Sequence, residues 1–186
     1  MNLFRLISGA SSAGLLAVGL SACLAEPNYS STPEISFDNI QQIHISGSAP
    51  RDSIALTIRY QDGDGDLGLT SDEVSNKNGA YFGTRYANNF FVVPYIKDAT
   101  GKFVTLASTG RFPNYTEATY YSRFDHIAGS ADSRSLPIKG TLVWSQSFFP
   151  YSPFYPGEEV QFQVSIADRA KHDSNTIMTS SIFISK

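Results

Sequence analysis

Residues 160–166 read Val-Gln-Phe-Gln-Val-Ser-Ile, and residues 54–60 read Ile-Ala-Leu-Thr-Ile-Arg-Tyr. In both stretches every second residue is large and apolar, and the residues between are polar or small. Side chains of a β-strand point alternately to its two faces, so each pattern predicts a strand with one buried face. Beyond roughly the first two dozen residues no stretch shows a convincing helical period. We therefore expect an all-β domain.

Other stretches rich in β-branched and aromatic residues raise the expected number of strands to about seven. They are residues 35–45, 90–96, 103–106, 138–144 and 177–184. Pro94 has no amide hydrogen to donate, so we expect an edge or a bulge at that position. About seven short strands joined by turn-rich loops predict an antiparallel β-sandwich over residues 35–186.

The segment from Val164 to Ile184 (VSIADRAKHDSNTIMTSSIFI) resembles the last two strands of bacterial Ig-like domains. There a strand ends in an Asp, a short Asn/Ser loop follows, and a Thr/Ser-rich strand closes the domain. The resemblance implies an Ig-like sandwich, in which the second and sixth strands run in the same direction. It does not extend to the paired cysteines of antibody domains, because this chain has a single cysteine.

An acidic loop follows the strand that ends at Tyr60. Residues 61–68 read Gln-Asp-Gly-Asp-Gly-Asp-Leu-Gly, with three aspartates separated by glycines. Carboxylates held so close repel one another unless a cation or open solvent relieves the repulsion. A ligand set made of oxygens alone suits Ca²⁺ better than a transition metal.

The spacing of these acidic residues partly matches an EF-hand. With Asp62 as position one, Glu73 falls at position twelve, but position six is Leu67 where an EF-hand needs Gly. The segment before the loop is also a predicted strand, so we reject a helix-loop-helix. The loop more closely resembles the Asp-Gly-Asp-Gly-Asp-Leu-Gly segment near the start of many small β-rich bacterial lipoproteins.

The expected topology adds a ligand from a distant part of the chain. If the second and sixth strands run the same way, Asp168 follows the sixth strand at the end of the domain where the acidic loop begins. Our hypothesis is one Ca²⁺ held by Asp62, Asp64, Asp66 and Asp168, with Asp72, Glu73 and Asp173 in reserve. The alternative is a solvated acidic turn in which Asp168 pairs with Arg169 or another basic residue.

Leu20-Ser21-Ala22-Cys23 closes an apolar N-terminal stretch that begins after Arg5. The tetrapeptide resembles the lipobox of bacterial lipoproteins, in which the cysteine is acylated. The resemblance implies a signal peptide over residues 1–22, a covalent lipid on Cys23 and a flexible tether over residues 23–34. The alternative is an ordinary secretory signal with a chance cysteine. Because Leu24 is not acidic, the resemblance also implies the outer membrane, facing the periplasm or the exterior.

Charge and motifs narrow the function. Without residues 1–22, which contain Arg5 of the 14 basic residues, 13 basic residues stand against 17 acidic ones. No basic stripe is present, which argues against a nucleic-acid partner. The three histidines are isolated in sequence, and no nucleophile elbow, phosphate loop or zinc spacing occurs. We therefore expect a non-enzymatic binding or assembly module, with a protein or polysaccharide partner in the cell envelope.

Residues 148–157 combine five aromatic residues with three prolines. We expect this loop at the end opposite the acidic loop, with its rings mostly buried as a cap on the sandwich. The alternative is that the rings are exposed and stack on sugars, which would indicate a carbohydrate-binding accessory lipoprotein. The candidate residues for that role are Phe149, Tyr151, Phe154 and Tyr155. A small envelope hydrolase that uses paired carboxylates is a further alternative.

Overall fold

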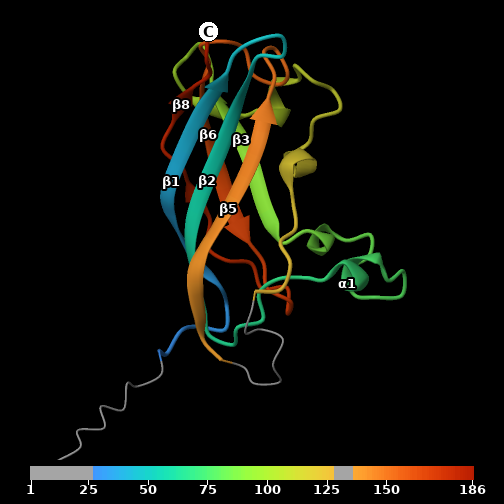
Figure 1. Ribbon diagram of the computed structural model, residues 1–186. Coiled ribbons are helices and arrows are strands. Elements are labelled where there is room, and N and C mark those ends of the chain that lie inside the picture. Colours follow the sequence, from blue (N-terminus) through green and yellow to red (C-terminus); the bar gives the residue numbers. More distant parts are fainter. Residues whose placement is uncertain (1–26, 128–135) are drawn as a thin grey trace, which may run out of the picture.

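Two antiparallel β-sheets pack face to face in the computed structural model, which describes residues 27–127 and 136–186 (Figure 1). Sheet A has the strand order β1-β2-β5, and sheet B has the order β4-β3-β6-β7, with β8 also paired to β6. The strands are β1 Glu34–Ile45, β2 Arg51–Asp62, β3 Phe90–Lys97, β4 Phe103–Thr105, β5 Ile138–Phe148, β6 Glu159–Ile166, β7 Ile177–Met178 and β8 Ile182–Phe183. The helices are short: α1 Ser71–Ser75 and the 3-10 turns η1 Arg85–Ala87, η2 Ala107–Thr109 and η3 Glu117–Tyr120. The predicted all-β sandwich is confirmed.

β2 is the central strand of sheet A, and its side chains alternate as the sequence predicts. Ile54, Leu56 and Ile58 are fully buried, while the residues between them are partly exposed. β6 alternates in the same way in sheet B. The facing apolar rows of the two sheets form one core, so the period-two pattern fixes which face of each strand is buried.

Aromatic rings fill the core toward the end where β5 finishes. The Phe148 ring centroid lies 4.9 Å from that of Phe154, and the Trp144 and Phe162 centroids are 5.9 Å apart. Tyr120, the last residue of η3 in the long β4–β5 connection, adds an edge contact to Phe148 at 5.5 Å. Part of this long connection therefore belongs to the core.

The expectation of an edge or a bulge at Pro94 holds only in part, because β3 has no bulge and is not an edge strand, but β4 does not pair with it at Pro94. β3 lies between β4 and β6, and its register with β6 runs from Phe90 to Ile96 without a shift. Pro94 is accommodated because the β4 ladder begins only at Tyr95. The Pro94 carbonyl accepts the N–H of Leu106 at 2.9 Å, just past the last ladder pair, so the missing amide hydrogen falls where the ladder has ended.

The direction of the strands places the acidic loop. β2 and β6 both run toward the end of the sandwich far from the C-terminus, which we call the acidic end (Figure 1). β5 runs the other way, so the β5–β6 loop lies at the opposite end, as predicted. The single predicted last strand is interrupted and forms β7 and β8, both paired with β6.

Candidate metal centre

Asp62, Asp66 and Asp168 converge at the acidic end. Each contributes one carboxylate oxygen to a group in which all the oxygens lie within 4.8 Å of one another. Asp62 is the last residue of β2, and Asp168 follows two residues after β6. The parallel course of these two strands therefore brings together residues 106 positions apart, as the sequence hypothesis required.

Hydrogen bonds from the backbone hold two of these carboxylates in place. Asp62 Oδ2 accepts the N–H of Asp66 at 3.1 Å, and Asp66 Oδ2 accepts the N–H of Ala170 at 3.2 Å. The other oxygens, Asp62 Oδ1 and Asp66 Oδ1, are buried and receive no hydrogen bond within the described ranges. Buried polar atoms almost always have a partner, so this arrangement leaves two oxygens suited to a cation.

Asp168 pairs with His172 and not with Arg169, so the pairing with a basic residue that the alternative interpretation included is present. Its Oδ1 accepts the His172 N–H at 2.7 Å, and its Oδ2 lies 2.8 Å from His172 Nδ1. Asp168 is only 2% exposed, and burial raises the pKa of its carboxyl group although these hydrogen bonds act in the opposite direction. The bonds to Asp168 in turn raise the pKa of His172. Carboxylates that bind a metal are commonly held by hydrogen bonds of this kind.

The carboxylates at the acidic end repel one another strongly. Burial and the charges of its carboxylate neighbours raise the pKa of Asp62 to about 7, and the same causes raise the pKa of Asp66 to about 6. Asp64 is outside the group of three oxygens, but its charge raises the pKa of all three aspartates. Asp64, the fourth predicted ligand, is therefore close enough to the other three aspartates for its charge to affect them.

The glycines between the aspartates allow neighbouring segments to approach the loop closely. A Cβ on Gly63 would lie 2.3 Å from the Tyr29 carbonyl oxygen, and a Cβ on Gly65 would lie 2.3 Å from that of Leu136. Gly65 also has a φ of +67°, which favours glycine. Carboxylates and closely packed glycines thus alternate along the loop.

Glu73 belongs to a hydrogen-bond network outside the group of three aspartates. We did not predict this network from the sequence. Thr70 and Glu73 form a capping box at the start of α1, and Glu73 also bonds Arg169 and His126. Burial raises the pKa of Glu73, but these hydrogen bonds outweigh it and lower the pKa to about 2. The Thr-x-x-Glu spacing was the available signal. Of the reserve ligands, Glu73 is bound in this network and Asp173 pairs with Arg85.

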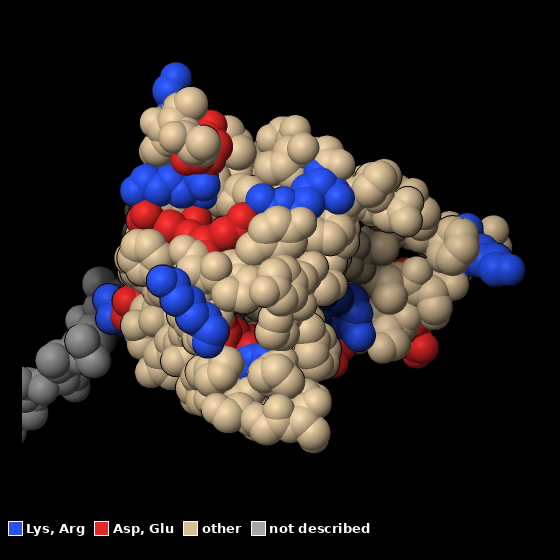
Figure 2. Space-filling view, turned by 90° about the horizontal axis from the view of Figure 1, so that it is seen from above, with Lys and Arg blue, Asp and Glu red and all other residues tan. Residues whose placement is uncertain are grey.

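The expectation that the rings of the β5–β6 loop are mostly buried was wrong. Phe154 is fully buried, but Phe149 is 52% exposed, Tyr151 66% and Tyr155 41%. Arg111 lies over the Tyr155 ring at 4.1 Å and pairs with Glu158. Figure 2 shows this end from above, where uncharged residues cover most of the surface and basic and acidic side chains lie next to each other.

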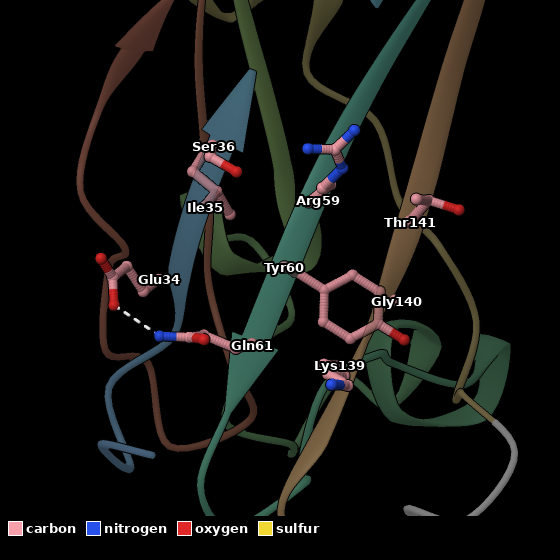
Figure 3. Close-up of a pocket in the computed structure, with 9 residues that line it drawn as sticks. All are labelled: Glu34, Ile35, Ser36, Arg59, Tyr60, Gln61, Lys139, Gly140 and Thr141. Atoms are coloured by element: carbon pink, nitrogen blue, oxygen red, sulfur yellow. Dashed lines mark hydrogen bonds between the residues drawn. The ribbon is translucent and has the colours of Figure 1, made fainter. Parts of the chain in front are cut away.

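A hollow of about 520 Å³ lies on the outer face of sheet A, near the acidic end (Figure 3). Its floor is formed by β1, β2 and β5, and its charged side chains have both signs. Arg59 pairs with Asp38, and Glu34 accepts a hydrogen bond from Gln61 at 2.7 Å, while Lys139 lies on β5. The mixture of charges gives no basis for naming a ligand.

The predicted lipidation site, Cys23, and the lipobox before it lie outside the described residues. Within the described ranges, no helix has both the length and the apolar composition needed to cross a bilayer.

No protein-family model matches this chain, and no curated protein matches it either. Among solved structures, the X-ray structure of Northeast Structural Genomics Consortium target SoR45 covers 83% of this chain and 87% of its own. The two are 8% identical, with a TM-score of 0.31, and so weak a likeness carries no argument about this chain.

Proposed function

We propose that this protein is a non-enzymatic binding or assembly module of the bacterial cell envelope, attached by a lipid on Cys23, with a structural Ca²⁺ at the acidic end. The observation that carries the proposal is the pair of buried oxygens, Asp62 Oδ1 and Asp66 Oδ1, which have no hydrogen-bond donor within residues 27–127 and 136–186. Asp62, Asp66 and Asp168 each bring one carboxylate oxygen into a single group, and a cation there would be bound by oxygen ligands alone.

Protons compete with a cation for the carboxylate oxygens of this site. Because the pKa of Asp62 is about 7 and that of Asp66 about 6, both groups are mostly ionised above pH 7.5. The repulsion is then largest, and a divalent cation relieves it best. Oxygen ligands from carboxylates favour Ca²⁺ among the biological cations. The burial of Asp62 and Asp168 supports a structural ion rather than a catalytic one.

Calorimetric titration of the detergent-solubilised, full-length protein with Ca²⁺ at pH 7.5 tests the site. We expect one ion per chain, with affinity reduced at least about 10-fold, or 1.4 kcal/mol, in Asp62→Asn. Asp72→Asn is the matched control. Asp72 was a reserve ligand in the sequence hypothesis, but in the structure it is exposed in α1 and is not one of the grouped carboxylates. Absence of heat in the wild-type protein would refute the calcium site.

The lipid anchor is tested independently of the ion. The resemblance of residues 20–23 to a lipobox supports acylation of Cys23 and an outer-membrane location. We expect the wild-type protein to fractionate with membranes and its N-terminal peptide to carry acyl mass. Cys23→Ser should lose the acyl mass and leave the membrane fraction. Membrane association unchanged by this substitution would contradict the anchor.

Exposure of the aromatic loop supports polysaccharide binding as a second candidate function. Tyr151 and Tyr155 have ring centroids 5.6 Å apart on a loop that is anchored by the buried Phe154. Flat exposed rings of this kind can stack on sugars. Affinity electrophoresis through gels containing envelope polysaccharide should show retardation that Tyr151→Ala removes. Phe82→Ala is the control, because Phe82 is a ring of similar exposure outside this loop.

A further inference from the structure

The segment that enters the domain is bonded to both loops of the metal centre. Gly63, between two of the aspartates, donates its N–H to the Ser30 carbonyl at 2.7 Å. The Asn175 side chain, in the loop that carries Asp168, accepts the Ile35 N–H at 2.7 Å and donates to the Ile35 carbonyl at 2.9 Å. Residues 30–35 are therefore held at two points by the loops that supply the carboxylates.

The hydrogen bond between Gly63 and Ser30 forms only if the backbone of the acidic loop lies close to residues 29 and 30. The Tyr29 carbonyl oxygen lies 2.3 Å from where a Gly63 Cβ would be, so the two backbones are too close for a side chain at Gly63. Asp62 immediately precedes this contact in the chain, and its carboxylate repels those of Asp64 and Asp66 when the centre holds no cation. A cation drawing these carboxylates together would stabilise the loop backbone that Ser30 bonds.

We infer that cation binding at the acidic end fixes residues 29–35 against the sandwich, and so couples the ion to the point where the domain leaves its tether. The inference rests on the proposed calcium site. Its consequence depends on the proposed lipid on Cys23. Six residue-to-residue steps lead from Cys23 to Tyr29, and at no more than about 3.6 Å per step they reach roughly 20 Å. The acidic end would then face the membrane at close range, and the ion would limit how freely the domain pivots on its anchor.

Amide hydrogen exchange on the detergent-solubilised, full-length protein tests the coupling, with Ca²⁺ in excess or removed by a chelator. The informative amides are those of Thr32, Ile35 and Gly63, whose N–H groups donate in these contacts or next to them. We expect each to exchange at least about 10-fold more slowly with Ca²⁺. The Val164 amide, in the core of β6, should be unaffected.

Two variants separate the coupling from the calcium site itself. Asp62→Asn should abolish the effect of Ca²⁺ on exchange. Asn175→Ala should retain Ca²⁺ binding by calorimetry but leave Ile35 fast-exchanging with or without the ion, because it removes the side chain that bonds the Ile35 backbone. If wild-type protein binds Ca²⁺ but these amides exchange at the same rate in both conditions, the coupling is wrong and the calcium site stands. If no Ca²⁺ binds, both are wrong.

Discussion

Asp62 places a carboxylate in a fully buried position where one of its oxygens has no donor among the described residues. Asp62→Asn keeps the size of the side chain and removes the charge. In the ion-free protein at pH 7.5 we expect the free energy of unfolding to rise by about 1–2 kcal/mol, because repulsion from the neighbouring carboxylates is relieved. Urea unfolding in chelator measures it, with Asp72→Asn as control. A loss of stability would show that the Asp62 charge is already compensated.

Removing the charge of Glu73 should lower stability, because its carboxylate is hydrogen-bonded to neighbouring residues. Glu73→Gln weakens the contacts to Arg169 and His126, and we expect a loss of about 1–3 kcal/mol in the free energy of unfolding at pH 7. Its pKa of about 2 lies below the unfolded value of 4.5, so its contribution is present above pH 4.5 and disappears as the pH falls toward 2. Unfolding titrations at pH 7 and pH 3 check both statements.

The Glu73 prediction has a matched control. Glu117 is also in the first turn of a short helix, η3, but it is exposed and no ion pair involves it in the described part of the chain. Glu117→Gln should change the unfolding free energy by less than about 0.5 kcal/mol. Equal losses in the two variants would mean that the Arg169 and His126 contacts of Glu73 add nothing to stability.

At the scale of elements, the β5–β6 loop contains one aromatic residue that is buried in the core and others that are exposed to solvent. Phe154 is fully buried against Phe148 and Phe162, so Phe154→Ala should cost about 3–5 kcal/mol. Tyr151 is 66% exposed, and Tyr151→Ala should cost less than about 1 kcal/mol. Urea unfolding of the two variants measures the difference. A cost for Tyr151→Ala as large as that for Phe154→Ala would refute this division.

The strands were predictable because alternation is a local property of the chain. The patterns at residues 54–60 and 160–166 identify β2 and β6, and the direction of these strands then places Asp168 beside Asp62. The exposure of Tyr151 was not predictable in this way, because it depends on how much room the core has after Phe154 and Tyr120 have filled it. The contact between Gly63 and Tyr29 is also non-local, since a glycine between aspartates does not show which segment approaches it.

In the whole molecule the two candidate sites lie at opposite ends. The acidic loop and the start of β1 are at one end, and the exposed rings of the β5–β6 loop are at the other. A domain attached through residues N-terminal to β1 would therefore present its aromatic loop away from the attachment point. Under the proposed function, ion binding and partner binding would occupy separate ends of one rigid sandwich.

The stability of the whole domain should depend on pH and Ca²⁺ together. The folded pKa values of Asp62 and Asp66, about 7 and about 6, lie above the unfolded value of 3.8. The ion-free folded state therefore binds more protons than the unfolded state between these values. The stability from protonation is fully present below about pH 4 and is lost as the pH rises through 6 and 7.

Calcium should reverse this trend, because a ligand at 100 times its dissociation constant adds about 2.7 kcal/mol to the free energy of unfolding. For a domain of this size that corresponds to a rise in Tm of roughly 5–11 °C at pH 7.5. The rise should shrink toward pH 5, where protons compete for the same oxygens. Calorimetric melting of the wild-type and Asp62→Asn proteins between pH 5 and 8, with Ca²⁺ or chelator, measures this dependence. A calcium effect that is equal at both pH limits would show that the ion binds at other groups.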